Sequence, residues 1–514
     1  MSCRGPLKAC IPLPIEEDIL QDVVKSAKDF AVTHGIGMRY KDKYEEESLY
    51  FAPFVLLPSV FPKQPFQDVV DIQPVLNELM HRVAHDQEFL TKTLSQTIEC
   101  DEFTKKLFDI YDCVMNEDLN KEVRHCLVVF DPFFVFKCLS LGILRSDFML
   151  DCHQNNSAFC CMKQVEINSI ASGFGWLGPA SQLIHRYVLT ELGRYDLVKN
   201  LPKNTTLENI ASSMIQAWKV YGSSMSVILF IVEDITYNIC DQRLLQFKIQ
   251  ELAPEIKIIR KTLTQVFNEG KLGSSKKELF FQDQEVALVY FRCGYSPCQY
   301  PSDDEWKARL MIERSLAIKC PSIYYHLAGT KKVQQELSVP GVLERFLGKD
   351  NPNIQEIRKL FAGLYPLNLN EEGDRTLEMV LNAPEKFVLK PQREGGGNNI
   401  YGSDIKTFFS ELKEPKERNA YIVMDRIWPP ITPNYLIVSG KKDLQIEDCV
   451  SELGIFGCIL GSEDSILFNQ QSGHMLRTKS NSSNEGGVAS GSGALDSVLL
   501  MDIELKDKDS NLQN

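Results

Sequence analysis

The segment KPQREGGGNN, residues 390–399, places a lysine, an acid and three consecutive glycines directly after the apolar run FVL. Glycines leave their backbone N–H groups unshielded and adopt positive φ without strain, so this loop can close around phosphate oxygens. Lys390 can place a positive charge beside the phosphates, and Glu394 can bind the magnesium ion that accompanies them. The sequence therefore predicts a phosphate site that is not a Walker A loop, with a flexible turn as the alternative.

Glu166 and Asn168 lie two positions apart and alternate with the apolar Val165 and Ile167. This period of two predicts a half-buried strand that carries both polar side chains on one face. Magnesium prefers oxygen ligands, commonly one or two carboxylates together with substrate phosphates. The pair can supply such ligands, and the alternative is the ordinary polar face of an edge strand.

The segment GFGWLG, residues 173–178, matches the pattern G-x-G-x-x-G after a predicted strand and before a predicted helix. A dinucleotide site also needs a second strand that ends in an acid about 20 residues further on. The segment RYDLVKNLPKNTT, which follows the helix, is too polar and too broken by proline for that strand. A dinucleotide site is therefore disfavoured, although a glycine-rich turn at a helix N-terminus can bind an anion such as a substrate carboxylate.

Several basic residues stand in otherwise neutral surroundings, and each alone is typical of a solvated surface charge. They are Arg145, Arg292, Lys331, Arg477 and Lys479. The sequence has no HExxH, GxSxG or protein-kinase catalytic loop, so hydrolase and protein-kinase functions have no support from motifs.

The composition is that of an ordinary globular protein. Of 514 residues, 44% are hydrophobic and 24% charged, and the length suits two to four domains or one composite fold. A net charge of -13 argues against nucleic acid or an anionic membrane as the main partner. Fifteen cysteines without a CxxC pair indicate reduced thiols. The start of the chain lacks a signal-peptide core, and Asp131, Pro132 and Lys137 interrupt the most apolar stretch, so we expect a cytoplasmic protein without a membrane span.

The hydrophobic pattern predicts the elements that must position these residues. It is helical from residue 16 to about 118, and from residue 226 to 301 strands and helices alternate as in a compact α/β unit. The remaining expected elements are a strand around 165–168, helices at 179–192, 206–222, 306–337 and 354–365, a buried strand at 226–234, and strands at 386–392 and 420–427 on either side of the glycine loop.

Taken together, these segments resemble one family. The blocks RSDFM, QVEINSI, YFRCGY, LAGTKKVQQEL, FVLKPQREGGGNNIYG, YIVMDRI, CVSELGIFG and HMLRTK occur in the order found in eukaryotic glutathione synthetases. The resemblance extends from near residue 20 to about residue 496. It implies a homodimeric α/β protein of the ATP-grasp fold that joins γ-glutamylcysteine to glycine through an acyl phosphate, with ATP converted to ADP and phosphate.

The resemblance also implies a division of the chain. The first part of the ATP-grasp core and a helical layer would occupy residues 16–225, and a smaller inserted α/β substrate-binding domain residues 226–301. The core would continue over 302–497, with a lid at about 340–425 that carries the glycine-rich loop and a mobile substrate loop at about 480–493. Residues 498–514 are expected to form a disordered tail.

By the same resemblance, ATP binds with Mg²⁺, expected as two ions, and the metal ligands are Glu166, Asn168 and Glu394. The expected ATP-binding residues are Glu166, Lys331, Lys390, Gly395, Gly396, Gly397, Asn398, Asn399, Tyr401, Met424, Ile427, Glu452, Lys479 and Glu485. Those expected to bind the substrates are Arg145, Ala171, Ser172, Gly173, Phe174, Glu233, Arg292, Cys293, Gly294, Tyr295, Arg477, Val488 and Ala489, and Arg145 and Arg477 are the expected catalytic residues. Such catalysis consists mainly of positioning and charge neutralisation.

The sequence departs from the family pattern near the expected substrate site. Where the family usually has ISASF, this chain reads IASGF, so Ala171 and Gly173 replace two serines. Where the family usually has RDGY, this chain has Cys293 in place of the aspartate. Cys298 stands where an arginine is usual, and Glu485 replaces an aspartate. Glu233 occupies a position where glutamine is usual, and a second carboxylate about 4 Å from a substrate carboxylate would cost roughly 4 kcal/mol at an effective dielectric constant of 20.

An apolar stretch at residues 125–138 has no counterpart in the family, and it is either an insertion or a wrongly translated intervening sequence, which peptide mass spectrometry would distinguish. Two alternatives to the expected function stay open. One is the same ligase chemistry with β-alanine or serine as the amine, since the acceptor pocket involves Val488 and Ala489. The other is a non-catalytic paralogue, which the departures motivate and the intact lysines and metal ligands oppose.

Overall fold

The structure is a computed structural model that describes residues 3–4, 7–40, 43–117, 139–152, 161–273, 277–441, 443–484, 486–488, 492–503 and 505–506. The apolar stretch at 125–138, Glu485 and Ala489 lie outside the described residues. Across the described chain, no helix combines the length and the apolar character needed to cross a membrane.

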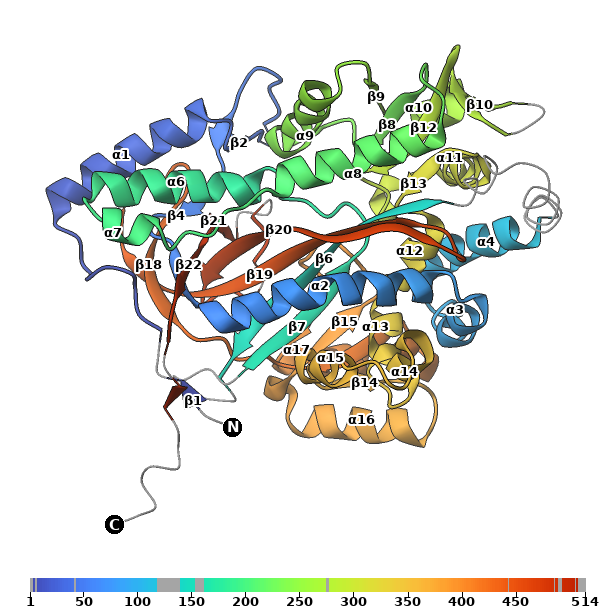
Figure 1. Cartoon of the computed structure of the whole chain (residues 1–514). Coiled ribbons are helices and arrows are strands. Elements are labelled where there is room, and N and C mark those ends of the chain that lie inside the picture. Colours follow the sequence, from blue (N-terminus) through green and yellow to red (C-terminus); the bar gives the residue numbers. More distant parts are fainter. Residues whose placement is uncertain are drawn as a thin grey trace.

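The centre of the molecule is a large mixed sheet that joins distant parts of the chain (Figure 1). Its main path runs β10-β11-β12-β13-β6-β19-β18-β4-β21-β20, with β7 beside β6, β8 beside β12 and β9 beside β8. The strands are β4 (Phe54–Val55), β6 (Ser140–Asp151), β7 (Cys161–Asn168), β8 (Val227–Ile231), β9 (Lys257–Lys261), β10 (Gly270–Leu272), β11 (Leu279–Phe281), β12 (Gln284–Phe291), β13 (Ile318–Cys320), β18 (Thr432–Ile437), β19 (Ile446–Gly461), β20 (Ile466–Ser480) and β21 (Ala494–Asp496).

Helices cover both faces of this sheet, as the alternation of side chains along β19 requires. Leu453 and Ile455 of β19 pack with helix α2 (Lys63–Ala84), whereas Phe456 and Cys458 pack with helix α8 (Thr206–Tyr221). Figure 1 shows α2 on one side of β19 and β20 and α8 on the other. Helix α8 ends as the sequence predicts, because Gly222 adopts φ +84° and stops it.

Most of the other helices occupy segments where the sequence predicts helical structure or the α/β unit, whereas the helices at 195–198, 342–347, 371–382 and 403–411 lie where it predicts no element. The other helices are α1 (Glu17–Thr33), α3 (Gln87–Leu94), α4 (Glu102–Asn116), α6 (Leu177–Glu191), α7 (Tyr195–Val198), α9 (Ile239–Leu252), α10 (Leu263–Glu269), α11 (Asp303–Arg314), α12 (Ile323–Ala328), α13 (Lys331–Leu337), α14 (Val342–Leu347), α15 (Ile354–Leu360), α16 (Glu371–Asn382) and α17 (Ser403–Glu411). Short 3-10 helices lie at η2 (Pro297–Gln299), η3 (Pro384–Lys386) and η4 (Pro415–Ala420).

A second, four-stranded sheet is built wholly from residues 364–425, inside the segment predicted to be a lid. Its antiparallel order is β14 (Leu364–Pro366), β17 (Tyr421–Asp425), β15 (Phe387–Pro391) and β16 (Ile400–Tyr401). This sheet has its own small core, which includes Leu367, Val380, Leu389, Ile405 and Val423. In Figure 1 this orange part lies below the central sheet, with α16 along its outer side.

Four segments differ from the sequence-based predictions. The predicted helical segment 16–118 is interrupted between residues 37 and 62 by four strands of two to four residues, which are too short to show a period. The predicted helix 306–337 is interrupted by β13, which is too short to show a period and is fixed by parallel pairing with β12 and β6. The predicted helix 354–365 ends at Leu360, because Leu364 pairs with Met424 of β17. The predicted disordered tail is ordered at its start, where the apolar strand β22 (Val498–Met501) pairs with β5 (Ser59–Pro62).

Two further short pairs lie among the described residues: β2 (Gly37–Met38) with β3 (Tyr50–Phe51), and β1 (Cys3–Arg4) with β23 (Leu505–Lys506). The dinucleotide reading has no support, because β7 pairs antiparallel with β6 and helices α6, α7 and α8 follow it before the next strand. In the unit at 226–301, β8 pairs in parallel with both β9 and β12. Strand β13 pairs with both β12 and β6, so the strands of this unit continue into the central sheet.

Gly457 lies where β19 approaches helix α2 closely. A Cβ atom at this position would lie 1.9 Å from Oδ1 of Asn77, a buried residue whose amide donates to Asn469 and to the carbonyl of Gln470. We expect Gly457→Ala to lower the free energy of unfolding by about 2 kcal/mol through overpacking. Urea unfolding would measure it, and the same change in an Asn77→Ala background should cost clearly less. Equal costs in the two backgrounds would contradict this explanation.

Candidate functional site

Two lysines and two glutamates from three separate segments meet between the two sheets. Lys331 begins helix α13, Lys390 lies on β15, Glu166 on β7, and Glu394 follows β15 in the glycine loop. The Nζ atom of Lys331 lies 2.8 Å from Oε1 of Glu394 and 3.2 Å from Oε2 of Glu166. Lys390 donates to the carbonyl of Val165 at 2.8 Å. Residues predicted from distant motifs therefore form one cluster.

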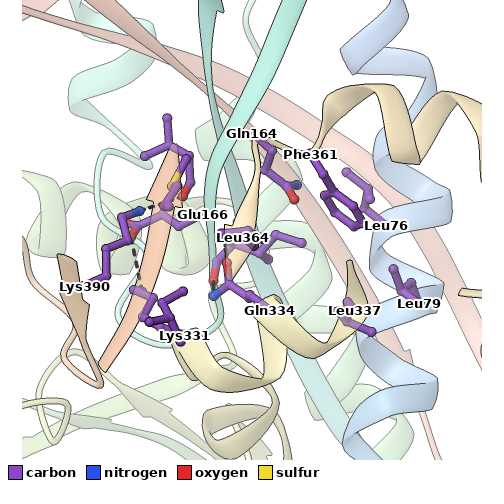
Figure 2. A pocket seen from close by; sticks show the side chains of 14 residues that line it. Leu76, Leu79, Gln164, Glu166, Lys331, Gln334, Leu337, Phe361, Leu364 and Lys390 are labelled. Atoms are coloured by element: carbon purple, nitrogen blue, oxygen red, sulfur yellow. Dashed lines mark hydrogen bonds and ion pairs between the residues drawn. The ribbon is translucent and has the colours of Figure 1, made fainter. Parts of the chain in front are cut away.

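Figure 2 shows the side chains that surround this cluster. Lys331, Lys390 and Glu166 lie on one side of a small enclosed pocket, and the apolar side chains of Leu76, Leu79, Leu337 and Phe361 lie on the other. The pocket holds only about 20 Å³, enough for about one water molecule. The charged groups therefore face closely packed apolar side chains, and electrostatic interactions are stronger in such surroundings than in water.

The protonation of the cluster follows from burial and from these contacts. Burial opposes the charge of Lys331, but attraction to Glu166 and Glu394 outweighs it and raises the pKa of the ammonium. Burial also disfavours an ionised Glu166, yet Lys331 and Lys390 outweigh it and lower the pKa of this carboxyl. Burial raises the pKa of Glu394, and the charge of Glu166 adds to the rise. The pKa of Glu166 is thus lowered and that of Glu394 raised, although both carboxylates contact the same ammonium.

This arrangement fits a divalent cation. Two carboxylates that converge on a single positive charge would both stay ionised beside a dication, and Asn168 adds an amide oxygen on the same strand as Glu166. Among the described residues, no three His, Cys, Asp or Glu side chains form a complete metal cage. Mg²⁺ commonly retains water and substrate phosphate as ligands, so one or two carboxylates can hold it.

A cavity of about 510 Å³ opens beside Lys390. Its lining includes the predicted ATP-binding residues Lys390, Asn399, Tyr401, Met424, Ile427 and Lys479. Apolar side chains that the sequence analysis missed complete the wall: Met149, Val165, Val388, Trp428 and Val450. Ligand cavities of about 300–1,000 Å³ that are mostly apolar, with a few polar groups, are typical of small-molecule and cofactor sites.

The glycine loop has the backbone that its sequence predicts. Gly395, Gly396 and Gly397 adopt φ values of +95°, +72° and +76°, a region open to glycine and strained for other residues. A Cβ atom on Gly395 would lie 3.0 Å from the ring of Tyr295, so the loop approaches a predicted substrate-binding residue closely. The phosphate side and the substrate side of the site are thus adjacent.

The two predicted catalytic arginines lie on β6 and β20, the strands that pair with β19 on its two sides. Arg145 of β6 forms a two-pronged ion pair with Asp147, with contacts of 2.6 and 2.7 Å, and donates to the carbonyl of Gly173 at 3.2 Å. Arg477 of β20 pairs with Glu452 of β19 at 2.5 Å. Burial opposes the charge of Arg477, but Glu452 and Asp147 outweigh it and raise the pKa of this guanidinium. Lys479 donates to the carbonyl of Asn484.

The predicted substrate loop at 171–174 is strained and held from two sides. Ala171 and Phe174 have φ values of +51° and +76°, which non-glycine residues adopt only when their surroundings enforce it. Arg292 donates to the carbonyl of Ala171 at 2.9 Å, and Arg145 to that of Gly173. The hydroxyl of Ser172 points inward and donates to the carbonyl of Ile143. Strain of this kind clusters at functional sites.

An anion does bind at the start of helix α6, but it belongs to the protein. Asp241 accepts hydrogen bonds from the backbone N–H groups of Phe174, Trp176 and Leu177. The expectation of a substrate carboxylate at this turn is therefore corrected, because an internal carboxylate already satisfies these donors. Asp241 also forms an ion pair with Arg292 at 3.4 Å.

Several departures from the family pattern lie in or beside the segment 292–299. The side-chain oxygen of Gln299 accepts from the backbone N–H groups of Gly294 and Tyr295, and its amide donates to Glu233 at 3.0 Å. Glu233 is thus held by a neutral amide. The side chain of Cys293 is buried, and burial raises the pKa of its thiol. Val488 is buried in the core that includes α1 and α6.

Sequence reasoning missed four residues that organise the site. Asp147 could have been found, because it lies two positions from Arg145 and shares its strand face. Asp241 and Trp428 have no local pattern that connects them with their partners, which are 64 to 67 and 276 to 277 residues away. Gln299 forms a local capping box with Ser296, but its contact with Glu233, 66 residues away, has no sequence signal. Only the folded chain reveals their part in the site.

Comparisons with known proteins agree with this site. A family model described as eukaryotic glutathione synthase, ATP binding domain, matches residues 17–500. The chain is 40% identical to the glutathione synthetase of Xenopus laevis over 94% of the chain and 97% of that protein. It is 39% identical to that of Homo sapiens, over 93% and 96%, and 38% identical to the chloroplastic one of Arabidopsis thaliana, over 95% and 86%. The apo structure of a glutathione synthetase-like effector from Globodera pallida matches with a TM-score of 0.74 at 23% identity, covering 96% of this chain and all of that one, which supports the mixed α/β fold.

Proposed function

The chain belongs to the eukaryotic glutathione synthase family, whose members are ligases, and we propose that it joins γ-glutamylcysteine to glycine while ATP is converted to ADP and phosphate. The observation that carries this proposal is the convergence of Lys331, Lys390 and two glutamates beside a cavity large enough for a nucleotide. ATP-dependent carbon–nitrogen ligation needs both features, because the phosphates must be held and their charge neutralised.

In the proposed complex, adenine lies against Met424 and Ile427, and the phosphates extend past Lys390 toward Lys331 and the glycine loop. Glu166, Asn168 and Glu394 would hold Mg²⁺, which neutralises charge on the phosphate oxygens. Backbone N–H groups of the loop then cover the γ-phosphate and exclude water. The glycines allow this close approach, since no side chain stands between backbone and phosphate.

The two arginines face the proposed reacting carboxylate. The cysteinyl carboxylate attacks the γ-phosphorus, the bond to the bridging oxygen breaks, and ADP leaves. The amine of glycine then attacks the acyl carbon, phosphate departs, and the amine proton passes to the departing phosphate or to solvent. Arg145 and Arg477 stabilise the negative charge that develops on the acyl and phosphoryl oxygens. Residues of the site thus act by positioning and charge rather than by nucleophilic attack.

Charge balance within the site supports this reading. Arg145, Lys331, Lys390 and Arg477 supply four positive charges, and Asp147, Glu166, Glu394 and Glu452 supply four potential negative ones. The buried cluster is therefore close to neutral before substrates bind, which limits its cost in stability. The phosphates of ATP would add negative charge, so a cation must enter with them.

Several finer expectations stay predictions. They are the domain limits, the homodimer, the cytoplasmic location, and the individual roles of the site residues. We propose the ATP-grasp arrangement for the two sheets, with the four-stranded sheet as the lid over the nucleotide cavity.

Phosphate release tests the proposed function. With ATP, Mg²⁺ and γ-glutamylcysteine, we expect release that depends on glycine and falls by about 100-fold or more in Lys390→Met, which removes a charge from the phosphate site. Parallel reactions with β-alanine, with serine and without amine identify the acceptor. Release with β-alanine or serine in place of glycine would indicate the alternative ligase. ATP binding without amine-dependent release would contradict the enzyme and favour a non-catalytic paralogue.

A further inference from the structure

Asp147 lies at the centre of the groups assigned to substrate and metal. Its side chain is 1% exposed, and its two oxygens accept from three side-chain N–H donors. Oδ1 accepts from Nε of Arg145, and Oδ2 accepts from Nη2 of Arg145 and from Nδ2 of Asn168 at 2.9 Å. Nη2 of Arg477 lies 3.6 Å from Oδ2. One carboxylate therefore touches two arginines and one predicted metal ligand.

The strand register holds this carboxylate in place. On β6, Asp147 pairs with Gly454 of β19 on one side and with Glu166 of β7 on the other, while Arg145 pairs with Asn168. A Cβ atom on Gly454 would lie 2.9 Å from Oδ1 of Asp147 and 2.9 Å from Cδ of Arg145. The glycine thus leaves the space that the ion pair fills. Neither side chain can move without disturbing the sheet.

The contacts fix orientation as well as place. Arg145 uses Nε and Nη2 on Asp147 and Nη1 on the carbonyl of Gly173, which sets the plane of its guanidinium. Asn168 turns its NH₂ group toward Asp147, so its amide oxygen points to the opposite side, where a metal ligand is needed. A buried carboxylate that accepts these bonds is itself unsuited to bind the metal, because a cation would have to displace the donors.

Resting on the proposed function, we propose that Asp147 is a positioning residue of the ligase that acts through Arg145, Arg477 and Asn168. It does not touch the reacting atoms. It sets the guanidinium planes that receive the developing charge and the face of Asn168 that receives Mg²⁺. A misplacement of about 1 Å in such groups can lower a rate by about 100-fold, and loss of a partner that orients a metal ligand weakens metal binding by about 10-fold to 100-fold.

Asp147→Asn tests this proposal, since it keeps the size of the side chain and removes its charge. We expect kcat for glycine-dependent phosphate release to fall by about 100-fold and the Mg²⁺ concentration that gives half-maximal activity to rise by about 10-fold. Binding of ADP without metal, measured by calorimetry, should stay within about threefold, because the adenine cavity lies apart from Asp147. A purely structural defect would instead weaken ADP binding and lower the unfolding midpoint together.

Two further variants keep the test decisive. Gly454→Ala retains every charge but crowds the Arg145–Asp147 pair, so it should reproduce the shift in Mg²⁺ dependence. In an Arg145→Lys background, Asp147→Asn should cost less than it does in the wild-type chain, because part of its effect passes through Arg145. If the wild-type chain is active and the activity of Asp147→Asn lies within about threefold of it, the inference is overturned and the proposed function is not. A wild-type chain without glycine-dependent release overturns the proposed function and the inference with it. Loss of ADP binding in both Asp147→Asn and Gly454→Ala overturns the positioning role.

Discussion

Lys331→Met should reduce ATP-dependent turnover by about 1,000-fold or more. The ammonium of Lys331 bridges Glu166 and Glu394. Without it, two buried carboxylates face one another, and the phosphate site loses a positive charge. Removing one partner of a buried ion pair typically costs about 3–5 kcal/mol of stability, of which protonation of Glu394 would relieve a part.

Lys332→Met is the matched control for this prediction. Lys332 is the next residue in the chain and is also buried, but its ammonium donates to Gln335 and Asn368. We expect this control to lower the unfolding midpoint and to keep turnover within about threefold of the wild-type value. Steady-state phosphate release and urea unfolding of both variants give the comparison. Turnover above about one tenth of the wild-type rate in Lys331→Met would contradict the role assigned to the bridging ammonium.

Local patterns explain how far the sequence could predict the site. The alternation around Glu166 and Asn168 predicts one strand, and that strand is β7. The three glycines after FVL predict a positive-φ loop, and all three adopt positive φ. Both inferences depend on steric rules that act within a few residues. The individual roles carried over by resemblance stay predictions, although the structure brings Lys331, Lys390 and Glu166 together.

Long-range pairing explains what the sequence could not predict. The bridge from Lys331 to Glu166 joins residues 165 positions apart, and its geometry depends on how α13 packs against β7. Strand β22 falls in the predicted disordered tail, yet it pairs with β5, which lies more than 400 residues earlier in the chain. Short strands such as β13 have too few residues for a period, so their partners decide their conformation.

The start of helix α6 shows a different limit. Physical reasoning from the glycine-rich turn predicts that backbone N–H groups there attract an anion. The anion is the carboxylate of Asp241, which comes from the first turn of α9. These N–H groups do hold a negative charge, as predicted, but the charge is on a side chain of the protein. The backbone pattern at a helix N-terminus does not indicate which carboxylate will bind there. Arg292, which pairs with the same Asp241, connects this turn to the predicted substrate site.

Acidification from pH 7 to pH 5 should destabilise the protein, with His185 responsible for a measurable share. Burial lowers the pKa of His185 to about 4, and its two ring nitrogens bond the hydroxyl of Ser497 and the carbonyl of Val55. Burial likewise lowers the pKa values of His81 and His474 to about 4. In the unfolded chain a histidine binds its proton near pH 6.5. Between pH 6.5 and pH 4 the unfolded state therefore binds protons that the folded state excludes, and the free energy of unfolding falls as the pH falls.

The size of the effect follows from the same two pKa values. At pH 5 each such histidine lowers the free energy of unfolding by about 2 kcal/mol relative to neutral pH. Asp496 acts in the opposite direction, because burial raises the pKa of its carboxyl to about 7 and the folded state then gains a proton on acidification. Comparing wild type with His185→Gln removes this shared contribution. Urea unfolding at several pH values should show the wild-type chain losing about 2 kcal/mol more than His185→Gln between pH 7 and pH 5. Ser497→Ala keeps the imidazole and removes its hydroxyl partner, so it should lower the free energy of unfolding at every pH and keep the wild-type dependence on pH. If the pH curves of wild type and His185→Gln are parallel, His185 binds its proton equally well in the folded and unfolded states, which would contradict the prediction.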